Sequence, residues 1–326
     1  MNGMRPPRVA VRLLRRLRAT RTGVPAATAL AALALLCGLA LGAGGGAGVG
    51  IPTLQAATAA PALGPDMAAS RADRRARRQR ARERQAVART LTRTPFIAQG
   101  GTRLREIALT FDDGPGPDTP RIMRVLRRAR APATFFFVGQ QLDLFGSMLR
   151  AEARDGFSIG DHTQNHAPLG RLPAREQRRQ LVTAARHARR YGVENLSFFR
   201  PPYGSYNRHT LQVARALGML MVLWTVDTGD FRRPGTKAIV NVVLSRARPG
   251  AIVLMHDGGG PRRETVQALP IIIRRLRHRG YRLVTVPQLL AEDPPSRHQA
   301  PPPGIGQPAT ATRNAAARRP RRARHR

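Results

Sequence analysis

The sequence predicts an α/β fold built on parallel strands, and three observations lead to that prediction. Between about residues 104 and 291, short apolar segments alternate with longer amphipathic ones. The short segments are rich in β-branched, leucine and aromatic residues, as expected of strands that are buried on both faces. The links are short, and Gly156, Gly192, Gly218 and Gly280 stand where helices are expected to end. This alternation indicates a (β/α) barrel or an open doubly wound sheet.

The expected elements follow one another in order along this region. Strands are expected at residues 106–111, 134–138, 157–160, 196–199, 220–224, 251–255 and 281–285. Helices are expected at residues 119–130, 141–154, 174–191, 207–218, 236–247 and 264–279. In both architectures functional groups gather at the carboxyl ends of the strands, so the residues directly after each strand are the candidates for a site.

The two ends of the chain differ from this middle region in composition. The whole sequence has 56 Lys+Arg against 19 Asp+Glu, a formal net charge of +37. Arginine runs occur at 71–84 ("RADRRARRQRARER") and 317–326 ("ARRPRRARHR"), beside sequence rich in Ala, Pro and Gly. Runs of like charge with few aromatics are usually disordered and solvated, and here they are expected to adhere at most weakly to an anionic cell envelope. Specific nucleic-acid binding is not expected, because no aromatic stacking platform accompanies the charge.

The N-terminus predicts export from the cytoplasm. Arginines between Arg5 and Arg21 precede an apolar stretch at 24–48, the pattern of a signal peptide or an uncleaved membrane anchor. The protein is therefore expected to be extracytoplasmic, either secreted or anchored to the cytoplasmic membrane. The single cysteine, Cys37, lies inside the apolar stretch, so the exported part has no disulfide and needs a proper hydrophobic core.

These observations divide the chain into four parts. Residues 1–50 are the signal peptide or anchor, 51–103 an Ala/Arg-rich linker, 104–291 the folded catalytic domain, and 292–326 a disordered basic tail. The expected fold class is thus α/β, with disordered basic tails at both ends, and the protein is expected to be a monomer.

Ionisable or polar side chains follow five of the expected strands. They are Asp112 and Asp113, His162 and His166, Arg200 and Tyr203, Asp227 and Asp230, and His256 and Asp257. Because parallel strands end at one edge of a sheet, these side chains are expected to meet on one face. The opposite strand ends carry few such residues.

A metal site is the first chemistry that this set indicates. If the loop "HTQNH" makes one helical turn, His162 and His166 lie on the same side and can share an ion. A carboxylate from another strand end would be the third ligand, with an open position left for water and substrate. Such a set serves hydrolytic zinc enzymes, but it also serves non-haem iron oxygenases.

The adjacent carboxylates favour hydrolysis. Neighbouring residues of an extended segment point to opposite sides, so Asp112 and Asp113 are expected to have different tasks, one binding metal and one acting as a general base. Arg200 can keep a neighbouring carboxylate ionised, and His256 can protonate a leaving group. Leu254, two positions before His256, is expected to form an apolar wall beside that acid.

Five motifs, "TFDDGP", "HTQNH", "RPPYG", "DTGDF" and "LMHDGG", resemble in order and spacing those of the polysaccharide deacetylases of carbohydrate esterase family 4. The resemblance covers roughly residues 104–291. It implies a distorted barrel of about seven βα units, a (β/α)7 barrel, that removes acetyl groups from a polysaccharide as a metal-dependent hydrolase of non-peptide carbon–nitrogen bonds. It implies zinc or another divalent transition metal such as cobalt or manganese.

The resemblance also implies individual roles. Its metal ligands would be Asp113, His162 and His166, and its catalytic residues Asp112 as base, Arg200 as its orienting partner, His256 as acid, Asp230 tuning that acid, and Tyr203, whose backbone N–H would bind the oxyanion. Leu254 would line the acetyl-methyl pocket with Tyr203 and Phe231 also contacting substrate. Phe231 stands where the family commonly has tryptophan, and Ala167 where it often has proline.

The motifs leave the polymer open. N-acetylglucosamine of peptidoglycan or of a chitin-like glycan is the expected substrate. An O-acetyl xylan esterase of the same family and a catalytically weak cell-wall-binding protein are the alternatives.

Overall fold

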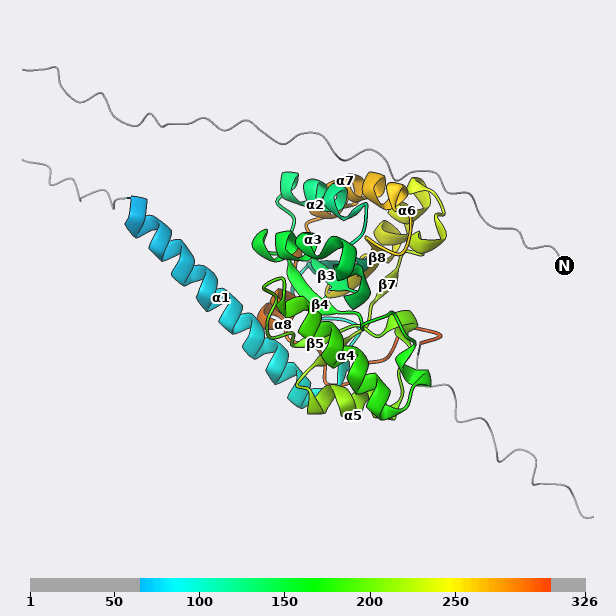
Figure 1. The fold of residues 1–326 in the computed structure, drawn as a ribbon. Helices are drawn as coiled ribbons and strands as arrows, with labels where there is room; N and C mark the ends of the chain where they lie inside the picture. Colours follow the sequence, from blue (N-terminus) through cyan, green and yellow to red (C-terminus); the bar gives the residue numbers. More distant parts are fainter. Residues whose placement is uncertain (1–64, 306–326) are drawn as a thin grey trace, which may run out of the picture. The chain divides into compact units, whose positions relative to one another are not determined.

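The structure is a computed structural model that describes residues 65–305 (Figure 1). The expected signal or anchor at 1–50, with Cys37, and the arginine run at 317–326 lie outside the described residues. Among the helices of residues 65–305, none is long and apolar enough to cross a membrane.

Nine strands and eight α-helices make up the described part of the chain, with short 3₁₀ turns between some of them. The strands are β1 (Phe96–Ile97), β2 (Glu106–Gly114), β3 (Thr134–Phe137), β4 (Ser158–Asp161), β5 (Phe198–Phe199), β6 (Leu220–Val222), β7 (Val226–Asp227), β8 (Ala251–His256) and β9 (Arg282–Val284). The helices are α1 (Pro65–Arg93), α2 (Thr119–Arg128), α3 (Leu142–Arg154), α4 (Ala174–Arg189), α5 (Arg208–Ala216), α6 (Thr236–Arg246), α7 (Arg263–His278) and α8 (Val286–Glu292).

The strands form one parallel sheet in the order β1-β6-β5-β4-β3-β2-β8-β7, with β9 paired to the first residues of β2. Strand β6 pairs with β5, and β7 pairs with β8 at the other end of the strand order. Only residues 223–225 separate β6 from β7, so these two ends of the sheet lie close together. This continuity curls the sheet round on itself and brings the carboxyl ends of β2, β4, β5 and β8 to one mouth. The predicted α/β fold with a distorted barrel is confirmed.

The strands are buried on both faces because the barrel has an apolar interior and an apolar outer layer. Alternate residues of β2 divide between these layers. Ala108 belongs to the cluster with Phe136, Met221 and Ile252, whereas Leu109 packs in the cluster beneath the helices on the other face. Helices α2, α6 and α7 cover that outer layer, which includes Ile122, Val243, Leu269 and Ile272.

All seven expected strands are present, and their ends differ from the expectation by a few residues. The expectation missed β1 and β7, which are two residues long, and α8, which begins at a Thr285 capping box. Two-residue strands carry no periodicity, so nothing in the pattern marks them.

The arginine run at 71–84 differs from its expectation. It forms part of α1 rather than a solvated, disordered linker. The arginines are exposed, but Ala86, Val87 and Thr90 near the end of the helix are buried, where α1 contacts α8 and β6. Packing of this short apolar stretch offsets the repulsion between the charges, as tertiary contacts often do for marginal helices.

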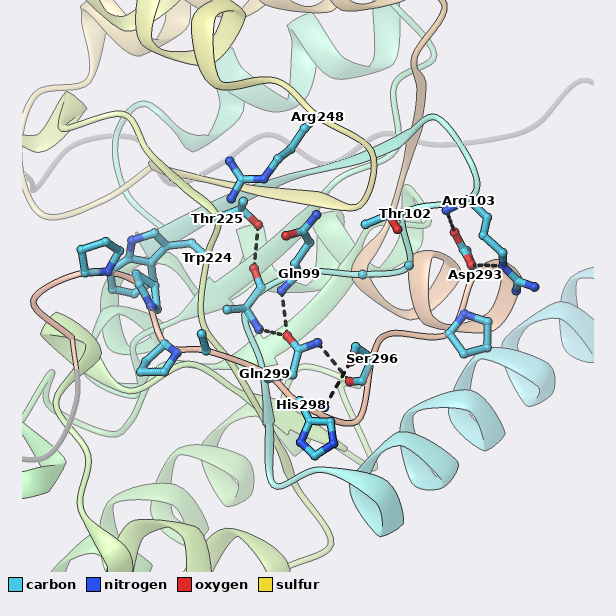
Figure 2. A pocket seen from close by; sticks show the side chains of 18 residues that line it. Gln99, Thr102, Arg103, Trp224, Thr225, Arg248, Asp293, Ser296, His298 and Gln299 are labelled. Atoms are coloured by element: carbon cyan, nitrogen blue, oxygen red, sulfur yellow. Dashed lines mark hydrogen bonds and ion pairs between the residues drawn. The ribbon is translucent and has the colours of Figure 1, made fainter.

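The boundary expected at residue 291 is also too early. Residues 293–305 lie against the barrel: the Gln299 side chain accepts hydrogen bonds from the backbone N–H groups of Ala98 and Gln99 at 2.9 and 3.2 Å. Ile305 packs on the interior cluster. Together with residues such as Gln99, Trp224 and Arg248, this segment lines a cavity of about 560 Å³. Figure 2 shows proline rings beside Trp224 and the Arg103–Asp293 ion pair among the side chains that line it. We call residues 293–305 the C-terminal strap.

Candidate active site

The carboxyl ends of four strands supply the polar cluster at the barrel mouth. Asp112 and Asp113 stand at the end of β2, His162 directly follows β4, Arg200 follows β5, and His256 ends β8. Strand register fixes these positions, since Asp112 pairs with His256 across β2 and β8. The predicted gathering of these residues on one face is confirmed.

A β-bulge at the end of β2 makes the side chains of Asp112 and Asp113 point in different directions. The pairing of β2 with β3 shifts register between Asp112 and Gly114, and Asp113 has a φ of 71°. Aspartate tolerates this left-handed conformation better than most residues. The two carboxyls consequently leave the strand in different directions: that of Asp112 toward Arg200 and that of Asp113 toward the histidines.

The loop that carries His162 and His166 makes no helical turn, so that expectation is wrong. Thr163 and His166 have φ values of 72° and 59°, and these two left-handed residues fold the loop back so that the imidazole centroids lie 5.0 Å apart. Buried polar contacts hold the strained backbone in place. The Asp161 carboxylate accepts from Thr163 N at 2.6 Å, and the Gln180 side chain accepts from the backbone N–H groups that follow.

The three expected metal ligands converge. One ligand atom each from Asp113, His162 and His166 lies within 4.8 Å of the others. Asp113 Oδ1 is 3.0 Å from His166 Nε2 and 3.4 Å from His162 Nε2, yet this buried oxygen has no hydrogen-bond partner. An orphaned carboxylate oxygen facing two imidazole nitrogens fits a divalent transition metal.

Both histidines are oriented through their other nitrogen. His162 Nδ1 lies 2.7 Å from the Arg200 carbonyl oxygen, which can only accept, so Nδ1 carries the proton and Nε2 is free to ligate. His166 Nδ1 lies 3.0 Å from the Tyr203 hydroxyl. The sequence predicted the Tyr203 backbone N–H as an oxyanion donor and Tyr203 as a substrate contact. It did not predict that the hydroxyl contacts His166, since spacing along a chain carries no signal for such a contact.

The electrostatics of the cluster follow from burial opposed by charge. Burial alone would raise the pKa of the Asp113 carboxyl, but the His162 and His166 rings lower that pKa overall. Burial alone would lower the pKa of His162, but Asp112 and Asp113 raise it overall. The site thus stabilises the negative charge of the Asp113 carboxylate and a positive charge beside it.

Arg200 holds Asp112 in place from inside the barrel. The fully buried guanidinium donates from Nη1 to Asp112 Oδ1 at 2.7 Å and to the Thr110 hydroxyl at 2.8 Å. Its remaining bonds go to the carbonyl oxygens of Val222 and Leu223, each at 3.1 Å. The guanidinium also stacks over a Phe136 ring. Asp112 Oδ2 remains 3.7 Å from His162 Nε2, beside the ligand cluster.

His256 is paired with Asp230 on the other side of the mouth. Its Nδ1 lies 2.6 Å from Asp230 Oδ1, and Asp230 Oδ2 accepts from the Thr265 hydroxyl at 2.7 Å. Burial alone would lower the pKa of His256, but the Asp230 carboxylate raises that pKa to about 9. Thr265 lies on α7, far along the chain, and the sequence reasoning missed it for that reason.

The expected substrate contacts border His256. Phe231 is 45% exposed, and its ring meets the imidazole edge-on at 5.6 Å between centroids. Leu254 is buried in the interior cluster, two positions before His256 on β8. Asp227 and Asp257 do not join the cluster contacts: Asp227 accepts from Gly229 N in a turn, and buried Asp257 accepts from the Thr119 hydroxyl.

Comparison with known proteins agrees with this geometry. The family model for polysaccharide deacetylase matches residues 99–222. A peptidoglycan-N-acetylglucosamine deacetylase of Bacillus cereus is 38% identical over 187 residues, 56% of this chain and 87% of that protein. A chitooligosaccharide deacetylase of Bradyrhizobium sp. is 37% identical over 198 residues, 57% of this chain and 90% of that protein.

Solved structures show the same fold. The Bc1960 peptidoglycan N-acetylglucosamine deacetylase superposes with a TM-score of 0.60 at 32% identity, covering 64% of this chain and 97% of that one. BA3943 of Bacillus anthracis, a CE4 family pseudoenzyme, superposes with a TM-score of 0.56 at 27% identity, covering 63% and 70%. With relatives of this identity and coverage, the chain belongs to the polysaccharide deacetylases of carbohydrate esterase family 4 and is a hydrolase of acetylated polysaccharides.

Proposed function

We propose that this protein removes the acetyl group from N-acetylglucosamine residues of peptidoglycan or of a chitin-like glycan, with the help of a divalent transition metal. The convergence of Asp113, His162 and His166 around an unpartnered carboxylate oxygen is the observation that carries the proposal. Relatives that are named peptidoglycan-N-acetylglucosamine and chitooligosaccharide deacetylases support the substrate class. Bc1960 was crystallised with an N-hydroxybenzamide, a group that chelates transition metals, which supports the metal.

A metal held by Asp113, His162 and His166 would polarise the acetyl carbonyl and acidify a water molecule. Asp112, fixed by Arg200, accepts the proton of the water that attacks the carbonyl carbon. The backbone N–H of Tyr203 donates to the oxygen that becomes negative. His256 gives its proton to the departing nitrogen as the carbon–nitrogen bond breaks, so that acetate and a free amino sugar are released.

The proposed base, Asp112, and the proposed acid, His256, lie in different surroundings, which suits their opposite roles in proton transfer. Asp112 accepts a hydrogen bond from the buried Arg200, whereas Asp230 raises the pKa of His256 to about 9, so His256 holds its proton at neutral pH. Leu254 and Phe231 flank the acid and would contact the acetyl methyl and the sugar.

The test combines metal content with acetate release. The full chain is expected to release acetate from N-acetylated chitooligosaccharide, to lose this activity with a chelator, and to regain it with zinc, cobalt or manganese. Asp112→Asn should keep bound metal and lose turnover by about 10²–10⁴-fold, because it removes only the proton acceptor. His162→Ala should lose both metal and turnover. Full activity of Asp112→Asn would overturn the assignment of the base.

Two further readings are separated by the same assay. The Xyl-CE4 domain of a termite-hindgut xylanase superposes with a TM-score of 0.53 at 33% identity, which keeps an O-acetyl xylan esterase as the alternative substrate class. Acetate release from acetylated xylan but not from N-acetylated glycans would favour it. A protein that only binds cell wall would bind peptidoglycan and release no acetate.

We also propose, from the basic and apolar N-terminal sequence, that the enzyme works outside the cytoplasm.

A further inference from the structure

Helix α1 carries a dense set of arginines that the catalytic site does not use. Among the ion pairs between side chains that the structure describes, none involves these arginines, and all eight are exposed. They are Arg71, Arg74, Arg75, Arg77, Arg78, Arg80, Arg82 and Arg84. Two acidic residues, Asp73 and Glu83, lie among these arginines in the sequence, and Glu83 accepts a hydrogen bond from the Gln79 amide. Eight arginines against two acidic residues leave this surface with a net excess of six positive charges.

Helical geometry arranges seven of the eight arginines in two rows, and Arg74 lies between the rows on the outer face. At 3.6 residues per turn, Arg71, Arg75, Arg78 and Arg82 share one flank, since their spacings are four, three and four residues. Arg77, Arg80 and Arg84 share the other flank. Like charges at these spacings destabilise an isolated helix. A bound polyanion would reduce the repulsion between the arginines and so stabilise α1.

A groove accompanies the second row. Arg80 and Arg84 border a cavity of about 370 Å³ between α1 and the amino ends of β4 and β5. Ser158, Asn195 and Ser197 line its other wall together with Glu194, and Glu83 borders the cavity from α1. Among the hydrogen bonds of the described residues, none uses the side chains of Ser158, Asn195 and Ser197, so they are free to bind hydroxyl or phosphate oxygens. The groove lies at the strand ends opposite the candidate active site, because the catalytic residues stand at the carboxyl ends.

The chemistry of this surface selects among polyanions. Arginine binds phosphate oxygens well, and hydroxyl and amide side chains add hydrogen bonds to a polyol. Helix α1 has no aromatic residue on which bases can stack, which disfavours single-stranded nucleic acid. Residues 71–84, the part of α1 that carries the arginines, include small residues such as Ala76 and Ala81 and no bulky apolar residue to enter a bilayer.

We propose that the α1 surface, defined as the eight arginines and the groove beside Arg80 and Arg84, binds a polyol phosphate polymer. Such a polymer would hold the enzyme at an anionic matrix while the mouth of the barrel stays open to glycan. The proposal concerns binding alone, so it stands or falls independently of deacetylation. A catalytically silent Asp112→Asn protein is expected to bind as well as the wild type.

The experiment measures binding of the full chain to lipid-free poly(glycerol phosphate) at several salt concentrations. Glutamine at all eight α1 arginine positions keeps helix propensity and removes the charge. This variant is expected to bind at least about tenfold more weakly and to show a shallower dependence of log affinity on log salt. Circular dichroism checks that α1 remains helical.

A second variant controls for total charge. It carries glutamine at eight exposed arginines elsewhere, whose side chains form no hydrogen bond or ion pair within the described residues: Arg124, Arg128, Arg175, Arg178, Arg189, Arg215, Arg274 and Arg275. The control is expected to keep most of the affinity. Equal losses in the two variants would overturn the proposal, since binding would then follow net charge rather than this surface.

Three further measurements sharpen the test. The pair Arg80→Gln and Arg84→Gln is expected to lower affinity more than the pair Arg71→Gln and Arg75→Gln, because only the first borders the groove; equal effects would remove the groove from the proposal. Vesicles of phosphatidylglycerol and single-stranded poly(dT) are expected to bind more weakly than poly(glycerol phosphate) at the same salt. Tighter binding of either one would replace the proposed partner.

Discussion

Asp230 holds His256 through both of its carboxylate oxygens. Oδ1 lies 2.6 Å from His256 Nδ1, and Oδ2 accepts a hydrogen bond from the His256 backbone N–H at 2.9 Å. Thr265 donates to the same Oδ2 and completes the support. The imidazole is thereby fixed with Nε2 pointing away from Asp230, and its proton affinity depends chiefly on one buried carboxylate.

Asp230→Asn is expected to move the alkaline limb of the pH–activity profile to lower pH. In the wild type Asp230 raises the pKa of His256 to about 9, so the acid keeps its proton until about that pH. Without the negative charge, burial lowers this pKa toward or below the ordinary value of about 6.5. The measurement is kcat/KM on N-acetylated chitooligosaccharide between pH 5 and 10. An unchanged alkaline limb would show that His256 is not the acid.

The same pair makes a pH-dependent contribution to stability. Because the folded-state pKa of His256 is raised, the contribution is fully present below the unfolded value near 6.5 and is lost as pH rises through about 9. The difference in unfolding free energy between wild type and Asp230→Asn should therefore shrink across this range. Urea titrations at pH 6 and pH 9.5 measure it, and a constant difference would contradict the coupling.

Arg200→Met is expected to destabilise the fold by about 3–5 kcal/mol, because it leaves the Asp112 carboxylate buried without its partner. The carbonyl groups of Val222 and Leu223 lose their donors in the same variant. Denaturant unfolding gives the magnitude. Adding Asp112→Asn should recover part of the loss, since the uncompensated charge is then gone. If the double variant were no more stable than Arg200→Met, the buried ion pair would not be the cause.

Tyr203→Phe is expected to weaken metal binding by about 10–100-fold, as loss of the partner of a ligating histidine typically does. The substitution removes the hydroxyl that contacts His166 Nδ1 and retains the ring and the backbone N–H. Isothermal titration with zinc reports the affinity, and kcat at saturating metal should change much less. Unchanged zinc affinity would mean that the hydroxyl does not orient His166.

The C-terminal strap predicts a difference between two truncations. Removing residues 306–326 should leave stability and activity unchanged. Removing residues 294–326 should lower both, because it uncovers Trp224 and deletes Ile305, which packs against Gly204 beside Tyr203. Ile305→Ala tests the contact alone, and its cost should stay below the 2–5 kcal/mol of a fully buried residue. Thermal unfolding and acetate release measure these effects, and equal behaviour of the two truncations would show that the strap is dispensable.

The sequence alone determined the alternation of strands and helices and the set of residues at the barrel mouth. Strand burial imposes apolar runs, and a parallel sheet places every strand's carboxyl end at one edge, so local pattern was sufficient to group Asp112, His162, Arg200 and His256. The motifs at those strand ends also sufficed for the family.

Tertiary structure decided what depends on contacts between distant residues. The left-handed φ angles of Asp113, Thr163 and His166, rather than a helical turn, bring the three candidate metal ligands together. Hydrogen bonds to groups such as the Gln180 side chain hold this strained backbone in place. Packing and hydrogen bonds between distant residues also decided four other features: the Thr265 contact with Asp230, the Tyr203 hydroxyl contact with His166, the packed end of α1 and the C-terminal strap. Such interactions are set by the position of each group in the folded chain, and they leave no periodic trace in the order of the residues.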